Sequence, residues 1–221
     1  MKPFLGCLAA IAIALIVVLV VGGVMAATGY NRLVNLSQAV DAQWAQVQNV
    51  YQRRADLIPN LVNTVAGAAN FEKSTLTDVT NARASVGKVQ VNANSAPNDP
   101  EKLKEYEDAQ RNLSSSLSRL LVVVERYPEL RANENFRGLQ AQLEGTENRI
   151  AVERGRFNEA AQRYNSTVRA FPMVFIAPMM GFQPKPYFSA NEGANVPPKV
   201  QFDFGSPAPT APSAPSPAPA H

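Results

Sequence analysis

The chain divides into four parts by the pattern of its apolar and polar positions. Residues 4–27 carry no charged side chain, and in residues 29–171 apolar residues recur with alternating steps of four and three. This second spacing is typical of one face of a helix in a bundle or coiled coil. Residues 172–204 are rich in aromatic residues and proline, and residues 205–221 are mostly Pro, Ala and Ser. We therefore predict a membrane anchor at 1–28, then a helical domain, an apolar strap and a disordered tail.

The apolar N-terminal segment is long enough to cross a membrane. Phe4 to Ala27 is 24 residues, or about 36 Å of helix against a hydrocarbon core of about 30 Å. The alternative is a cleaved signal peptide, because Met25-Ala26-Ala27 resembles a cleavage site with small residues. The apolar stretch is longer than such peptides normally carry. We therefore favour a retained transmembrane helix that binds the lipid bilayer through residues 4–27.

The charges that flank this segment bear on its orientation. Lys2 and the free amine lie on one side, and Arg32 followed by Asp41 lies on the other. The small excess of positive charge before the segment favours an amino terminus in the cytoplasm. We therefore expect a single-pass protein of the bacterial inner membrane whose soluble domain lies outside the cytoplasm.

Three proline-bounded regions carry the helical spacing. We call the row of positions spaced three and four apart the seam. The seam of the first region crosses Pro59, which lacks an N–H and is expected to break or kink a helix. A plausible N-cap at Asp99 followed by Pro100 opens the second region, and Pro128 and Pro172 end the second and third. The seam positions of the first region up to residue 65 are Leu33, Ser37, Val40, Trp44, Val47, Tyr51, Arg54, Ile58, Leu61 and Val65.

Helix lengths favour one architecture. A break near Pro59 gives segments at 30–58, 60–92, 99–127 and 133–170, each about 44 to 57 Å long. Such matched lengths predict an all-α fold, an antiparallel four-helix bundle with long helices preceded by the transmembrane helix. The alternative is a continuous first helix, which would overhang its partners.

Composition excludes several classes of active site. The chain has one cysteine, Cys7, and one histidine, His221. A Ser–His–Asp triad, a Cys–His dyad, a Cys/His zinc site and a disulfide framework all need residues that the chain lacks. The net charge is +3, without a Lys/Arg block, so we expect no nucleic-acid partner. We also expect no cofactor, no metal and no catalytic residue.

Several short strings are spread over residues 30 to 188. They are YNRLV at 30–34, QRRADLIPNLV at 52–62, ENRIAV at 147–152, RFN at 156–158, YN at 164–165, FP at 171–172, GF at 181–182 and PYF at 186–188. Together they resemble one bacterial family, the LemA family. The resemblance implies a single-pass membrane protein with an exposed helical bundle, and it implies no established enzyme activity or ligand.

The polar cluster beside Pro59 is a candidate interaction epitope. It contains Arg53, Arg54, Asp56 and Asn60. In one interpretation the arginines pair with acids on a neighbouring helix and Asp56 caps a turn at Pro59. In the other, the cluster lies at a bundle end and its guanidinium groups bind a carboxylate or phosphate of a partner. Arg54 falls on the seam and Arg53 does not, so we expect Arg54 to be structural.

A second polar pair, Asn148 and Arg149, adjoins the seam residue Ile150. Its position allows the same two interpretations, and we expect a buried polar network rather than a part of the epitope.

Two functions of different classes fit these features. The first is a membrane-anchored, non-catalytic interaction or scaffold protein of the bacterial envelope with an unidentified membrane or envelope protein partner. The alternative is a carboxylate-based or metal-dependent hydrolase that uses Asp56, Glu72, Glu147 or Glu153. Convergence of two or more carboxylates in one pocket would favour the hydrolase, and scattered carboxylates would leave only the scaffold. The apolar segment after Pro172 also has open interpretations: a strap packed on the bundle, a partner-binding segment or a membrane-surface contact.

Overall fold

The computed structural model describes residues 2–67, 72–89, 91–92 and 95–189, with side chains from residue 12 onward. The predicted tail and the end of the predicted strap lie outside these residues. The described part is helical and contains no strand. Its elements are α1 (Lys2–Ala66), α2 (Lys73–Lys88), α3 (Pro100–Val124), α4 (Pro128–Ala132), α5 (Glu134–Arg169), α6 (Met173–Ile176) and the 3₁₀ helix η1 (Pro178–Met180).

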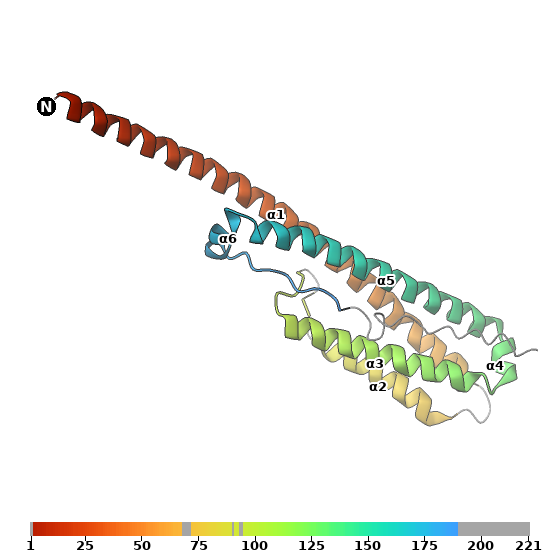
Figure 1. The fold of residues 1–221 in the computed structure, drawn as a ribbon. Coiled ribbons are helices and arrows are strands. Elements are labelled where there is room, and N and C mark those ends of the chain that lie inside the picture. The colour runs from red at the N-terminus through yellow and green to blue at the C-terminus, as the bar shows by residue number, and fades with distance from the viewer. Residues whose placement is uncertain (1, 68–71, 90, 93–94, 190–221) are drawn as a thin grey trace, which may run out of the picture. The chain divides into compact units, whose positions relative to one another are not determined.

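The long helices pack as two antiparallel pairs. The second half of α1 lies along α5, and α2 lies along α3 (Figure 1). The first half of α1 extends away from these helices, and its apolar side chains are exposed from residue 12 onward. The protein therefore has a long apolar N-terminal helix that continues directly into a helical body.

The predicted break at Pro59 is wrong, because α1 passes through Pro59 and ends at Ala66. Proline cannot donate to the carbonyl four residues earlier, which here belongs to Ala55. That carbonyl accepts a hydrogen bond from Nε of Arg83, on α2, at 3.0 Å. The side chain of another helix thus replaces one bond that the proline removes. The chain breaks after Ala66 instead, so α2 is shorter than the predicted segment.

The predicted start of the second region is confirmed. The Asp99 carboxylate accepts a hydrogen bond from the Glu101 backbone N–H at 2.9 Å, and Pro100 is the first residue of α3. At the start of α5, the Asn133 side chain accepts from the N–H groups of Asn135 and Phe136. Both caps satisfy N–H groups that have no partner within the helix.

The core consists of two apolar clusters, and the apolar seam positions of α1 from Val40 to Val65 are all buried in them. The proximal cluster, nearer the exposed apolar half of α1, is rich in aromatic residues; the distal cluster is mainly aliphatic. The proximal cluster includes Leu33, Val40, Trp44, Val47, Tyr51, Tyr106, Ile150, Phe157, Tyr164, Met173 and Phe188. The distal cluster includes Ile58, Leu61, Val65, Val79, Leu113, Leu117, Leu120, Val124, Phe136 and Leu143.

Residues 182–188 form an extended segment that packs on the proximal cluster. The Asn165 side chain donates to the Lys185 carbonyl and accepts from the Lys185 N–H, both at 2.7 Å. The Asn158 side chain makes the same pair of bonds with Phe188, at 3.0 and 2.8 Å. The Phe188 ring lies 6.1 Å from that of Trp44, centroid to centroid. Two asparagines of α5 therefore hold the segment as a short β-strand would be held by a neighbour.

A buried lysine joins this segment to the loop before α3. Nζ of Lys185 donates to the Ala96 carbonyl at 3.2 Å and lies 3.8 Å from the Asp41 carboxylate, which accepts from the Ala96 N–H at 2.8 Å. Burial lowers the pKa of Lys185, and the nearby Asp41 partly offsets this effect. The three groups tie α1, the loop and the extended segment together.

Candidate functional site

A polar layer separates the two apolar clusters, and its centre is Arg54. Only 1% of this residue is exposed. Its guanidinium donates to Glu147 Oε1 and to Ser114 Oγ, each at 2.7 Å, and to the Gln110 side chain. Arg54 thus bridges α1 to α3 and α5, and its burial follows from its seam position.

A second ion pair lies beside the first. Arg154 of α5 contacts the buried Glu107 of α3 at 2.5 Å. The Arg54 guanidinium lies 5.2 Å from the centroid of the Tyr51 ring, within the range of a cation–π contact. Burial raises the pKa of Tyr51 to about 12, although Arg154 and Arg54 act in the opposite direction. Burial likewise raises the pKa of Tyr106.

The remaining residues of the predicted epitope lie on the surface. Arg53, Asp56 and Asn60 are exposed, at helical spacings of three and four that place them on one side of α1. The Asp56 carboxylate accepts from the Gln52 side chain at 2.7 Å rather than capping a turn. The group lies within the part of α1 that packs on α5 and not at the end of a helix, because α1 continues past Pro59.

Asn148 and Arg149 are both exposed, so the predicted buried network at this pair is wrong. The residue before them, Glu147, carries the network through its contact with Arg54. This contact places the two exposed groups, one on α1 and one on α5, at the same level along the helices.

The candidate carboxylates of the hydrolase hypothesis have separate partners. Asp56 accepts from Gln52, and Glu147 pairs with Arg54. Glu72 lies 3.7 Å from Arg126, and Glu153 pairs with Arg156 at 2.8 Å and accepts from Gln43 at 2.6 Å.

One groove does contain two carboxylates. Glu147 and Glu144 line a groove of about 470 Å³ between α3 and α5. Glu144 accepts from Gln140 at 3.0 Å, so it too has a neighbour on its own helix. Within residues 12–67, 72–89, 91–92 and 95–189, no group of three or more His, Cys, Asp or Glu side chains is arranged to hold a metal.

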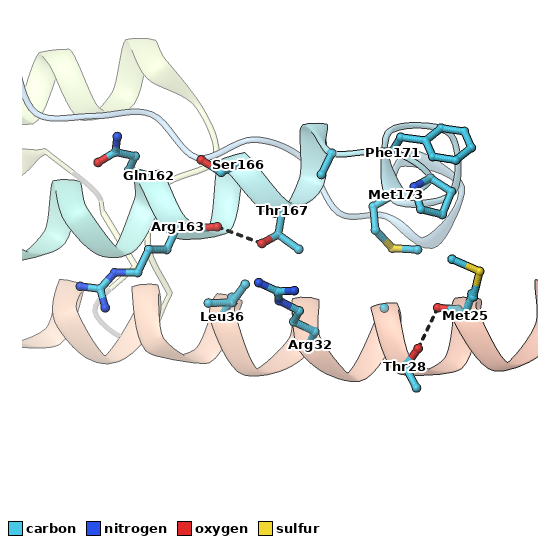
Figure 2. Close-up of a pocket in the computed structure, with 13 residues that line it drawn as sticks. Met25, Thr28, Arg32, Leu36, Gln162, Arg163, Ser166, Thr167, Phe171 and Met173 are labelled. Atoms are coloured by element: carbon cyan, nitrogen blue, oxygen red, sulfur yellow. Dashed lines mark hydrogen bonds between the residues drawn. The ribbon is translucent and has the colours of Figure 1, made fainter.

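Another groove lies at the opposite end of the helical body, where the apolar half of α1 extends away from α5. This groove of about 700 Å³ runs between α1 and the end of α5. Figure 2 shows Arg32 of α1 and Arg163 of α5 reaching into it, and Met25 facing Met173. Helices α1 and α6 approach each other closely here, because a Cβ added to Gly29 would lie 2.5 Å from the Met173 side chain.

Comparison with known proteins gives the family. The LemA family model matches residues 43–202. The chain belongs to the LemA family. Its relatives include the magnetosome proteins MamQ 2 of Paramagnetospirillum magneticum, 26% identical over 76% of this chain and 67% of the relative, and MamQ of Magnetospirillum gryphiswaldense, 25% identical over the same shares. Protein LemA of Metamycoplasma hominis is 23% identical over 73% of this chain and 69% of the relative.

LemA membership and the apolar part of α1 together indicate a membrane-associated protein. Within α1, a window of mean hydropathy 2.5 with no buried residue is long and apolar enough to cross a membrane. The matched region begins at residue 43 and covers most of the helical body, the extended segment and the residues that follow it. The family therefore accounts for the body of the protein, and the apolar helix precedes it.

The sequence pattern missed part of the polar layer. Gln110 is a polar residue at the 3–4 spacing of α3, between Tyr106 and Leu113, and its side chain accepts a hydrogen bond from Arg54. Glu107 and Arg154 gave no separate signal, because a charged residue next to a seam position normally lies on a solvated helix face. Their pairing depends on how α3 and α5 are placed, which the spacing along one helix does not define.

Proposed function

We propose that the protein is a membrane-anchored, non-catalytic interaction or scaffold protein of the bacterial envelope. It binds another membrane or envelope protein through the exposed side of α1 at Arg53, Asp56 and Asn60, together with Asn148 and Arg149. In this proposal the two helical pairs form an antiparallel four-helix bundle that carries the binding surface at a fixed distance from the bilayer.

The observation that carries the proposal is the continuity of α1. One helix includes both the candidate membrane span and the residues around Arg54. Because a helix is stiff over this length, the binding surface would lie at a fixed distance from the bilayer. The apolar stretch of 24 residues is longer than signal peptides normally carry, which supports a retained anchor.

The burial or exposure of each arginine supports a structural role for Arg54 and a binding role for Arg53 and Arg149. Arg54 is used inside the protein, where three side chains accept its hydrogen bonds. Arg53 and Arg149 are exposed, and an exposed guanidinium can bind a carboxylate of a partner in a bidentate manner. The charge before the apolar segment supports a bundle outside the cytoplasm, which protease accessibility in spheroplasts would test.

Site-specific photocrosslinking in native membranes tests the proposed surface. A photoreactive residue at Arg53 or Arg149 is expected to form the same discrete adduct, whereas one at the exposed Arg119 of α3 is not. The triple change Arg53→Ala, Asp56→Ala and Asn60→Ala should remove the adduct without lowering the melting temperature. An adduct of equal yield at all three positions, or none at Arg53 and Arg149, would overturn the proposal.

A further inference from the structure

Residues 171–180, which contain α6 and η1 and are called the α6–η1 segment below, expose an unusual number of large apolar side chains. Phe171 is 83% exposed, Phe175 is 69% exposed and Met179 is 88% exposed. Val174 and Met180 add to the same short segment. Large apolar residues gathered in this way are uncommon on a protein surface that faces only water. They contrast with Met173 and Ala177 of the same segment, which are buried and fix it to the bundle.

The position of this segment along α1 indicates what covers it. Met173 packs against Gly29, and the Phe182 ring lies 5.6 Å from that of Tyr30, centroid to centroid. Both α1 residues follow the apolar segment that ends at Ala27 by only two or three positions, or about 3 to 5 Å of helix. Each interfacial layer of a bilayer is about 5 to 7 Å thick. A helix that crosses the membrane through residues 4–27 therefore brings α6–η1 to the level of the lipid headgroups (Figure 1).

The groove next to this segment has the charge that suits an anionic headgroup. Its lining includes Arg32 and Arg163 and no acidic residue. Arg163 also pairs with Glu159 at 3.4 Å, but both of these side chains are well exposed and can rearrange. The groove opens between apolar side chains, Met25 on one wall and Phe171 and Met173 on the other (Figure 2). Basic and apolar groups are thus combined at one place.

We infer that α6–η1 and the adjoining groove form a lipid-binding surface of the bundle. Phe171, Phe175 and Met179 insert among the lipids at the membrane interface, and Arg32 and Arg163 bind the phosphate of an anionic phospholipid. The inference rests on the membrane anchor of the proposed function but not on its protein partner. Its consequence is a bundle held against the bilayer at a second point, so that it cannot swing freely about α1.

Fluorescence of the full chain in vesicles tests the insertion. Cys7, the single cysteine, is replaced by Ser, and Phe175→Cys or Met179→Cys is labelled with an environment-sensitive nitrobenzoxadiazole probe. Val122→Cys is the matched control, because Val122 is also apolar and 70% exposed but lies near the end of α3, beside the distal cluster. In vesicles of phosphatidylcholine and phosphatidylglycerol, the probe at 175 and 179 should shift to the blue and lose intensity when doxyl-labelled lipid is included.

Charge variants test the headgroup contact. Quenching at Phe175→Cys should be stronger with phosphatidylglycerol than with phosphatidylcholine alone. The double change Arg32→Gln and Arg163→Gln should remove this difference, whereas Arg137→Gln at the start of α5 should leave it unchanged. Equal quenching in both lipids for the labelled Phe175→Cys protein that retains Arg32 and Arg163 would overturn the role of the arginines.

Two outcomes would overturn the insertion. A probe at 175 and 179 that behaves as at Val122→Cys would show that water covers the segment. A blue shift without quenching by doxyl lipid would show that protein, such as a second copy of the chain, covers it. Flotation of the vesicles after carbonate treatment separates the two proposals. A chain that floats but shows no quenching contradicts the lipid surface alone, and one that does not float contradicts the membrane anchor.

Discussion

The halves of the helical body that contain the proximal and the distal cluster hold their helices together by different means. In the proximal half, the Trp44 ring contacts those of Tyr106, Phe157 and Phe188, and Trp44 Nε1–H donates to the Asn92 carbonyl at 2.9 Å. In the distal half, leucines of α3 pack against Ile58, Leu61 and Val65 with few polar contacts. The proximal half therefore depends on particular partners, and the distal half on apolar side chains at regular spacing.

This difference shows where apolar residues at regular 3–4 spacing are enough to pack the helices. Aliphatic residues three and four apart can exchange for one another with modest loss, because packing needs mainly volume and shape. The proximal half must also cover an irregular loop and the extended segment 182–188, whose backbone groups need polar partners. It accordingly contains the two asparagine tethers and the buried Lys185.

The largest expected effect is at the centre of the proximal half. Trp44→Ala should lower the free energy of unfolding of residues 30–190 by about 3 to 5 kcal/mol, because it removes a fully buried aromatic side chain. Denaturant unfolding followed by circular dichroism measures this loss. Trp44→Phe, which retains much of the ring contact, should cost less. A loss below about 1 kcal/mol for Trp44→Ala would contradict a core built around this residue.

The next effect depends on pH and on Tyr51. Its pKa is raised from 10.0 to about 12 in the folded protein. Between these values the folded state keeps the phenolic proton that the unfolded chain loses, so the free energy of unfolding falls as the pH rises, by about 2 to 3 kcal/mol for this group. Tyr106 and Tyr164, whose pKa values are also raised, act in the same direction.

Unfolding curves at pH 10 and 12 compare the protein with Tyr51→Phe. The variant should lose stability over this interval less steeply. Lys185 contributes in the opposite direction, because its lowered pKa raises stability as the pH approaches 10.5. An identical loss of stability for both proteins would show that folding does not raise the pKa of Tyr51.

A smaller effect is expected in the polar layer between the halves. Arg54→Ala should lower the free energy of unfolding by about 2 kcal/mol, because it leaves Gln110 and Ser114 without a donor, and the half-exposed Glu147 can regain water. Arg53→Ala, one residue away and exposed, should change it by less than about 0.5 kcal/mol. Equal and large losses from both variants would show that the helical register here is wrong.

The smallest expected effect concerns Pro59 in the distal half. Pro59→Ala should raise the free energy of unfolding by about 1 kcal/mol, because alanine restores the helical N–H that the Ala55 carbonyl lacks. Arg83→Gln should then destabilise the natural sequence more than the Pro59→Ala variant, since only the former needs the Arg83 bond. A double-mutant cycle measures this coupling. Additive effects would mean that Arg83 does not replace the missing bond.

Much of the fold was predictable, and the exceptions have a physical cause in common. The 3–4 spacing predicted the buried positions of α1, including Arg54, and Asp99-Pro100 predicted the start of α3. The course of the chain at Pro59 was not predictable, because the Arg83 bond joins residues 28 positions apart. A local rule that assigns proline to a helix end cannot include a donor from another helix.

The candidate site shows the same limit. The burial of Arg54 and the exposure of Arg53 follow from the seam. Asn148 and Arg149 were predicted to be buried, and both are exposed. Those two residues adjoin Ile150, and proximity to a seam residue does not define which side of the helix faces the core. The tether from Asn165 to Lys185 joins helix to extended backbone, so no periodicity along either segment reveals it.

The continuity of α1 through Pro59 into the distal cluster is the central claim, and one distance tests it. Spin labels at Ala42→Cys and Ala66→Cys, with Cys7→Ser, lie on exposed positions of the full chain. A continuous helix predicts about 36 Å between the labelled positions, from 24 residues at about 1.5 Å each. A chain that turned back at Pro59 into a neighbouring antiparallel helix would give about 18 Å. Pulsed electron paramagnetic resonance showing the longer distance supports the account, and a population at the shorter one would contradict it.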